Sequence, residues 1–385
     1  MNQIVQEPIK VAFRDRLTRD EWRRMAAMFG FILFLHVAGA SLMWKATTGN
    51  YVLADGTLFG WGTAALAYIL GMRHAFDADH ISAIDNTTRK LMSEGQRPLA
   101  VGFFFSLGHS SVVFLLTILL GFGIETLGSQ LNNDDSALQH YTGLIGISVS
   151  GTFLMIIGIL NLIVLVSIVG VFIKMRQGAY NEEELEKHLD SRGLLMRFFG
   201  PIARRIDASW KMYPLGILFG LGFDTATEVA LLILAGSSTI AGLPWWAMIS
   251  LPFFFAGGMS LLDTIDGSFM NFAYGWAFSK PVRKVYYNLI ITGLSVAVAL
   301  FVGGLQILQI FAQQLNLTGG LWDAALAFNL NSAGYFIVGS FVVVWTVALL
   351  LWKYGKIEER WHNKAHEAQL SRGEESDHTN RPRRR

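Results

Sequence analysis

Residues 57–82, TLFGWGTAALAYILGMRHAFDADHIS, contain the features that decide the fold class. The first part of this stretch is almost wholly apolar, and about 20 such residues are enough for a helix to cross a bilayer. The second part carries three charged residues and two histidines: Arg73, His74, Asp77, Asp79 and His80. Charged groups at membrane depth are costly and face the interior of a helix bundle. The stretch therefore predicts a membrane helix that presents polar groups to partner helices.

The rest of the 385-residue chain repeats the apolar pattern. Hydrophobic residues make up 52% of it and charged residues only 16%, against about 25% charged in soluble domains. There is no cysteine, which excludes disulfides and thiolate sites. The sequence therefore predicts an all-α, polytopic integral membrane protein with eight transmembrane helices. The predicted spans are 26–46, 57–82, 99–124, 141–173, 213–236, 245–275, 286–311 and 332–353.

Lysine and arginine lie on one side of this pattern. Of the 31 basic residues, all but Lys45 and Arg73 fall before the first span, after the last, or in alternate loops. An excess of basic residues marks the cytoplasmic side, so both termini are predicted to be cytoplasmic. Topology accounts for these charges, and no nucleic-acid partner is predicted. The predicted parts are a cytoplasmic segment 1–25, an eight-helix transmembrane domain 26–353 with a cytoplasmic loop 174–212, and a basic cytoplasmic tail 354–385.

Polar residues also interrupt other predicted spans. His36 lies in the first span, and three further motifs are FFFSLGHSSVV (103–113), LGFDTATE (221–228) and GMSLLDTIDG (258–267). The 57–82 stretch and these motifs together contain seven formally charged residues. If all seven faced lipid, each would add about 2.5–3.5 kcal/mol to the free energy of membrane insertion, or roughly 17–25 kcal/mol in total. That exceeds a typical folding free energy of about 5–15 kcal/mol. These groups must therefore meet one another, water or a cation inside the bundle.

The donor types narrow the kind of cation. Imidazole suits nickel, cobalt, zinc and copper, so imidazole and carboxylate without thiolate favour a divalent transition metal over Na⁺, K⁺ or Cu(I). On an ideal helix His74 and Asp77 share a face, as do Asp77 and His80, whereas Asp79 points elsewhere. The candidate metal-site residues are His74, Asp77, Asp79, His80, His109, Asp224, Glu228, Asp263 and Asp266.

Two pairs of spans resemble each other. FDADHISA (76–83) aligns with FDTATEVA (223–230), and FFFSLGHS (103–110) aligns with FFFAGGMS (253–260). Under the predicted topology the paired spans run in opposite directions, which is the arrangement of an inverted repeat with a substrate site between its halves. The matches are short and rich in phenylalanine, so chance similarity is the alternative.

By these motifs the chain resembles the nickel/cobalt transporter family of secondary permeases. His74, Asp79 and His80 match the family signature HxxxxDH, and the other three motifs follow in order. The resemblance implies eight spans and high-affinity uptake of Ni²⁺ and Co²⁺ across the bacterial inner membrane. It implies a transporter rather than an enzyme, with the metals as transported substrates and no cofactor. It also associates metal preference with the first span and with the position of Phe76, and a histidine such as His36 together with Phe76 resembles members that carry both metals.

Two other functions remain as alternatives. A proton-coupled exporter of another divalent transition metal would use the same residues in the opposite direction. An intramembrane metalloenzyme is a weaker alternative, because the chain lacks an HExxH motif. There is no GxxxxGK[ST] loop, so we expect the ion-motive force to drive transport, unless a separate ATPase subunit does so. Protons are candidate coupling ions, and the sequence leaves the oligomeric state open.

Overall fold

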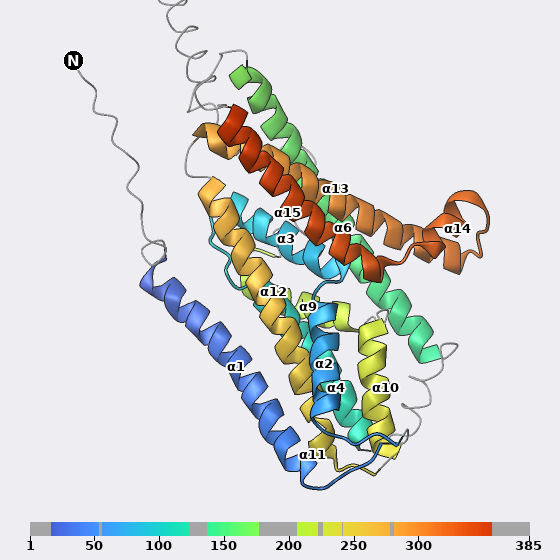
Figure 1. The fold of residues 1–385 in the computed structure, drawn as a ribbon. Coiled ribbons are helices and arrows are strands. Elements are labelled where there is room, and N and C mark those ends of the chain that lie inside the picture. The colour runs from blue at the N-terminus through green and yellow to red at the C-terminus, as the bar shows by residue number, and fades with distance from the viewer. Residues whose placement is uncertain are drawn as a thin grey trace, which may run out of the picture.

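The computed structural model describes residues 17–53, 56–122, 137–176, 206–221, 226–240, 242–277 and 281–355 (Figure 1). This part of the chain is helical, apart from one isolated β-bridge between Val52 and Leu58, which confirms the all-α prediction. Its helices are α1 (Arg19–Thr47), α2 (Trp61–His74), α3 (Ala78–Ser93), α4 (Val101–Gly121), α6 (Ala137–Arg176), the 3₁₀ turn η2 (Ser209–Lys211), α9 (Met212–Gly220), α10 (Ala226–Ile240), α11 (Trp245–Met248), α12 (Ser250–Ala277), α13 (Pro281–Gln314), α14 (Gly320–Ala327) and α15 (Leu330–Gly355).

Six stretches in the described residues are helical, long and apolar enough to cross a membrane. They are Arg19–Thr47, Val101–Gly121, Gly143–Gly170, Trp245–Phe272, Val285–Gln314 and Ala333–Tyr354. They match six of the eight predicted spans. The other two, 57–82 and 213–236, are each divided between two shorter helices, α2 with α3 and α9 with α10. Of the predicted cytoplasmic segments, 1–16, 177–205 and 356–385 lie outside the described residues.

The first division falls inside the motif RHAFDADH. Helix α2 ends at His74, Asp77 has an extended backbone, and α3 starts at Ala78. Aspartate is favoured immediately before a helix, so the sequence supports a new start there. Helix α3 then runs to Ser93, well past the predicted span end at residue 82. That boundary was therefore wrong.

Polar bonds explain why α3 is buried although its second half is hydrophilic. Arg89 donates to Thr292 Oγ1 of α13 at 2.9 Å, and Asn161 of α6 donates to Asn86 Oδ1 at 2.8 Å. Buried polar groups of this kind are tolerated because they are hydrogen-bonded. Hydropathy alone assigns such residues to a loop. For this reason the predicted span ends at residue 82, before the helix itself ends at Ser93.

Helix α2 crosses the long helix α12 at very short range. A Cβ added at Gly71 would collide with the backbone carbonyl of Phe255, and one at Gly258 would collide with that of Tyr68. Each helix thus uses a glycine to admit the backbone of the other, as small residues do in membrane bundles.

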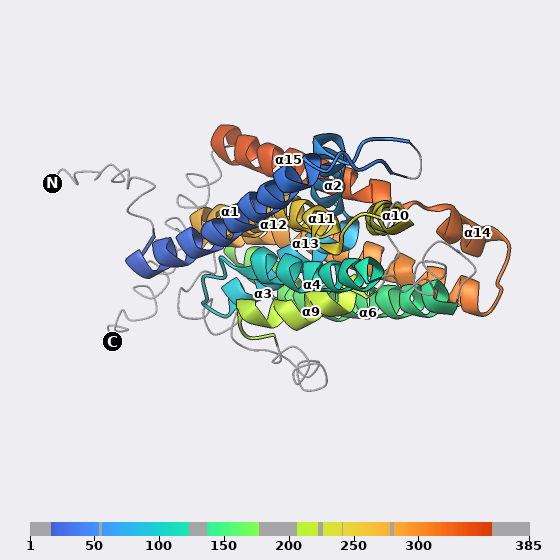
Figure 2. The ribbon, with the colours of Figure 1, turned by 90° about the horizontal axis from the view of Figure 1, so that it is seen from below.

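Helices α4 and α9 make the same kind of crossing and lie side by side (Figure 2). Gly216 faces the carbonyl of Phe105, and Gly108 faces the carbonyl of Tyr213. The spacing Tyr-x-x-Gly therefore occurs in both α2 and α9, and each opposes a Phe-x-x-Gly in its partner helix.

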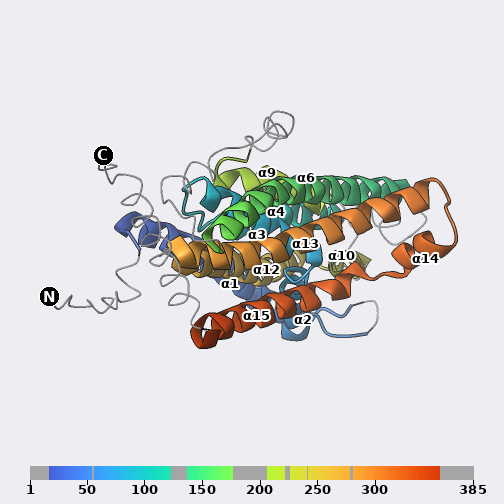
Figure 3. The ribbon, with the colours of Figure 1, turned by 90° about the horizontal axis from the view of Figure 1, so that it is seen from above.

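The second half of the bundle packs around α13. Helix α13 runs alongside α6, and α15 also packs against it (Figure 3). The buried apolar core of this half joins α3, α6, α13 and α15 around large side chains such as Tyr287, Leu154 and Ile337.

The chain segments with basic residues are bonded together. Arg97, in the loop after α3, binds Glu21 at the start of α1 at 2.9 Å. Lys90 donates to the carbonyl of Ile206, just before α9, at 2.6 Å. These contacts gather the start of α1, the end of α3 and the approach to α9 at one end of the bundle.

We expect Gly216→Ala to destabilise the protein by about 1–3 kcal/mol, because the added methyl group overpacks a backbone crossing. The matched control is Gly339→Ala on α15, where a Cβ meets nothing within 4 Å. There the loss of a helical glycine should be neutral or stabilising by about 0.5–1 kcal/mol. Thermal unfolding of the detergent-purified variants tests this. Equal midpoints for Gly216→Ala and wild type would contradict the close crossing.

Candidate metal centre

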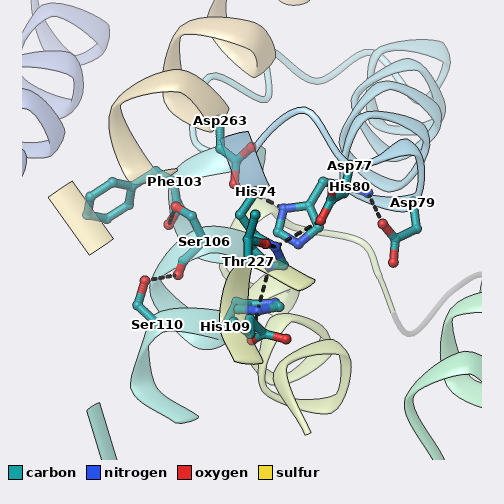
Figure 4. Close-up of polar contacts among 11 residues, drawn as sticks. His74, Asp77, Asp79, His80, Phe103, Ser106, His109, Ser110, Thr227 and Asp263 are labelled. Atoms are coloured by element: carbon teal, nitrogen blue, oxygen red, sulfur yellow. Dashed lines mark hydrogen bonds and ion pairs between the residues drawn. The ribbon is translucent and has the colours of Figure 1, made fainter. Parts of the chain in front are cut away.

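The interruption between α2 and α3 brings two histidine rings together edge-on. His74 is the last residue of α2 and His80 lies in the first turn of α3, with ring centroids 4.5 Å apart. His109 projects from the middle of α4, and its ring centroid is 4.6 Å from that of His74 and 4.9 Å from that of His80. All three side chains are buried. Figure 4 shows the three side chains close together.

The three imidazoles are compact enough to hold one ion. One nitrogen from each ring lies within 4.8 Å of the others, and these rings form the one such group of His, Asp and Glu found among the described residues. His74 Nε2 and His109 Nε2 are 2.9 Å apart. Two nitrogens bound at about 2.05 Å and at right angles to each other would be about 2.9 Å apart. The spacing therefore suits two neighbouring ligands of one metal ion.

Each histidine also has a carboxylate partner from its surroundings. Asp77 Oδ2 is 2.9 Å from His74 Nδ1, and Asp263 Oδ2 of α12 is 3.4 Å from His80 Nδ1. Carboxylates beside metal-binding histidines orient the rings and raise their basicity. These two acidic groups are buried with the rings they contact.

Glu228 of α10 lies at the edge of the three-nitrogen group. Its Oε1 is 2.5 Å from His109 Nε2, the same atom that faces His74. The neighbouring Thr227 places Oγ1 2.9 Å from His74 Nδ1. This position would allow Glu228 to add an oxygen donor to the three nitrogens.

Several buried polar atoms of the site have no hydrogen-bond partner within the protein. Apart from the atoms joined in the ion pairs above, they include Asp77 Oδ1, His80 Nε2 and His109 Nδ1. Each buried unsatisfied group costs about 1–3 kcal/mol. The concentration of such atoms in one place indicates a site built for a ligand. Its imidazole and carboxylate donors, without thiolate, fit a divalent transition metal.

Asp79 points away from the histidines, as Figure 4 shows. Its Oδ1 accepts from the backbone N–H of His80 at 3.0 Å, and Ser150 Oγ of α6 lies 3.3 Å from its Oδ2. Asp266 lies one turn beyond Asp263 on α12 and lines a separate, largely apolar cavity of about 320 Å³ next to α13 and α15. Asp224 lies outside the described residues.

The two expected selectivity residues contact different helices. His36 Nδ1 is 2.7 Å from the carbonyl oxygen of Ile32, and its ring packs edge-on against Tyr68 of α2 at 5.4 Å. The ring of Phe76 stacks on Tyr335 of α15 at 5.6 Å. Neither contact reaches the three-imidazole group. An effect of these residues on metal preference would therefore act through the position of α2 and of the break that follows it.

Sequence reasoning missed Ser150 and Gln306, and it gave Thr227 of the motif LGFDTATE no place among the metal-site residues. Thr227 contacts His74, Ser150 contacts Asp79, and Gln306 contacts Ser150. Ser150 and Gln306 are polar residues within otherwise apolar stretches of α6 and α13. That interruption of an apolar run was the available signal, but uncharged side chains are too common in membrane helices to single these two out.

The chain is similar to proteins that are named as nickel or cobalt transporters. Residues 60–351 match a family model described as "High-affinity nickel-transport protein". The chain is 58% identical to "Nickel transporter NicT" of Mycobacterium tuberculosis, over 90% of this chain and 93% of the relative. It is 44% identical to "High-affinity nickel-transport protein NixA" of Helicobacter pylori strain 26695, over 85% and 97%. It is 40% identical to "Cobalt transport protein NhlF" of Rhodococcus rhodochrous, over 86% and 93%.

No solved structure matches the chain. The family model covers the interrupted helices, the three histidines and their carboxylate partners, and it describes transporters rather than enzymes. With six helices long and apolar enough to cross a bilayer, the protein is a multi-pass membrane protein. The chain belongs to the family of high-affinity nickel-transport proteins.

Proposed function

We propose that this protein takes up Ni²⁺ and Co²⁺ across the bacterial inner membrane by secondary transport. The observation that carries the proposal is the buried group of three imidazoles with carboxylates beside it. This group lies where the helix pairs α2–α3 and α9–α10 meet the continuous helices α4 and α12. A mixed nitrogen and oxygen site favours these cations over Na⁺, K⁺ or Mg²⁺. The names of the relatives support nickel, and one of them supports cobalt.

We further propose eight membrane crossings with both termini in the cytoplasm. In this topology α2 and α3 together complete one crossing, and α9 and α10 complete another. Non-helical backbone at membrane depth is tolerated where it is buried in protein, as it is at residues 75–77. The bonds of Arg97 to Glu21 and of Lys90 to Ile206 support a common side for the basic segments.

The proposed crossings include an inverted repeat of α2–α4 and α9–α12. Its support is the reciprocal pattern of glycine contacts. The first helix of each half, α2 or α9, crosses the last helix of the other half through Tyr-x-x-Gly against Phe-x-x-Gly. A pseudo-two-fold axis in the membrane plane would relate such contacts, and transporters with this symmetry bind their substrate near the midplane. The histidine group lies beside both crossings, because His74 follows Gly71 and His109 follows Gly108.

The driving force in this proposal is the ion-motive force. Metal ligands must be deprotonated, so binding and release of the cation move protons. An inside-negative potential favours entry of a dication by about 4.6 kcal/mol per 100 mV. Export of the metal is the competing direction, and it predicts a lower rather than a higher metal content in expressing cells.

In metal-starved cells that express the protein, we expect uptake of radiolabelled Ni²⁺ that unlabelled Co²⁺ inhibits. A protonophore should abolish the uptake while ATP is maintained, because the potential drives entry. His80→Ala should lose uptake and remain in the membrane, and the exposed His140→Ala on α6 is the matched control. Near-normal uptake by His80→Ala would refute the site. Loss on ATP depletion alone would refute secondary transport.

Glu228→Gln should weaken Ni²⁺ binding about 10–100-fold, as loss of an outer carboxylate does, or more if Glu228 is a direct ligand. The amide keeps the size of the side chain but not its charge beside His109. Isothermal titration of purified protein with Ni²⁺ measures the change. Glu94→Gln, which removes a carboxylate paired with Lys90 at the far end of α3, is the control and should bind normally. An unchanged affinity for Glu228→Gln would remove it from the site.

Changing Phe76 or His36 should alter the ratio of Co²⁺ to Ni²⁺ uptake more than the amount of protein. Phe76→Leu loosens the contact with Tyr335 that holds the α2–α3 break, and His36→Ala loosens the contact with α2. We expect a change in the ratio of about threefold, or roughly 0.6 kcal/mol. Phe336→Leu, on the exposed face of α15, is the control. If wild type carries nickel while cobalt is neither transported nor competing, the pair does not set preference in this way.

A further inference from the structure

A polar cavity lies next to the histidine group. Its volume is about 200 Å³, and it is enclosed by the start of α3, the second half of α13 and the segment that leads into α15. Asp77, Asp79, Gln306, Gln309 and Asn329 supply its polar lining. In the proposed topology these ends of α13 and α15 face away from the cytoplasm, so the cavity is on the side from which the metal arrives.

A buried serine contacts two residues of the cavity lining. Ser150 Oγ lies 3.0 Å from Gln306 Oε1 and 3.3 Å from Asp79 Oδ2. Ser150 and Gln306 are each 2% exposed. Ser150 thereby holds the carboxylate of Asp79 and the amide of Gln306 together on one side of the cavity, where both can offer oxygen to a cation or to its bound water.

Asp77 provides a separate indication of a ligand. It is 2% exposed and lines the cavity, and its Oδ1 has no hydrogen-bond partner. Its Oδ2 is also 2.9 Å from His74 Nδ1. One carboxylate therefore adjoins both the cavity and the imidazole group, so an ion in the cavity would have a continuous polar route to the histidines.

The donors define the class of ligand. The polar side chains on the cavity wall offer carboxylate and amide groups but no imidazole, and oxygen ligands suit hard, hydrated dications. Six water molecules occupy roughly 180 Å³ at about 30 Å³ each, so the cavity can hold an ion that keeps most of its hydration shell. Mg²⁺ and Mn²⁺ meet these requirements as well as Ni²⁺ and Co²⁺ do.

We propose that this cavity is an entry site that binds a hydrated divalent cation through Asp79 and Gln306, which Ser150 holds in place, before Asp77 passes it to the histidines. The inference rests on the proposed uptake function. The two sites then have different roles. The entry cavity, with its oxygen ligands, binds dications with little discrimination, and the imidazole group selects among them. External Mn²⁺ should then occupy the first site and compete with Ni²⁺ without needing the second.

Ni²⁺ uptake measured against external concentration tests the entry site. Gln306→Met and Ser150→Ala should each raise the KM about three- to tenfold, as expected from loss of a bond to a charged partner, and leave the maximal rate within about twofold. Millimolar Mn²⁺ should raise the KM of wild type, and should do so less in these variants. Gln313→Met, two turns further along α13 and exposed, is the control and should behave as wild type.

A binding measurement separates the inference from the uptake proposal. In purified His80→Ala protein, electron paramagnetic resonance should detect one site for Mn²⁺, and adding Ser150→Ala or Gln306→Met should weaken it about three- to tenfold. An unchanged KM, together with unchanged Mn²⁺ binding, would overturn the entry site even if wild type transports nickel. Absence of nickel uptake by wild type would instead overturn the proposed function, and the Mn²⁺ titration would still decide whether the entry site exists.

Discussion

Three imidazole rings buried together inside an apolar bundle impose the main constraint on this structure. His74, His80 and His109 can lie there only because carboxylates surround them and because a cation can satisfy the atoms that remain without partners. The helix break at residues 75–77 follows from the same constraint. A continuous helix would place His74 and His80 six residues apart, about 9 Å along the axis, whereas the break lets the two rings meet with centroids 4.5 Å apart.

Close helix crossings make this convergence geometrically feasible. Gly71 and Gly258 bring α2 onto α12, and Gly108 and Gly216 bring α4 onto α9. Helices in lipid gain little from burying apolar surface, so contact between backbones is a main source of their association. Because the crossings stand next to the histidines, the same glycines that hold the bundle together also set the distances between the donors of the proposed metal site. Under that proposal, stability and metal binding are coupled at these positions.

The polar groups divide into two chemical environments along α3. On the side of α2 and α4, nitrogen donors dominate, and affinity for late first-row transition metals should be high. On the side of α6 and α13, Asp79, Ser150 and Gln306 present carboxylate, hydroxyl and amide groups and no imidazole. Asp77 stands between the two. A dication that gives up water gradually faces smaller barriers than one that must lose its whole shell in a single step, and this order of environments supplies such a gradient.

The sequence by itself determined the all-helical class, six of the apolar helices, the asymmetric distribution of basic residues and the kinds of donor available. Those properties depend on composition and order within each segment. The tertiary structure decided which donors meet: Asp263 joins His80, while Asp79 turns toward Ser150 and Asp266 lines a different cavity. It also decided that the helix containing the signature ends at His74, and that a new helix starts at Ala78 and runs to Ser93. Hydropathy records how a segment partitions between water and lipid as a whole. The rotation of each helix, and the partners that α3 finds in Asn161 and Thr292, depend on helices far away in the chain.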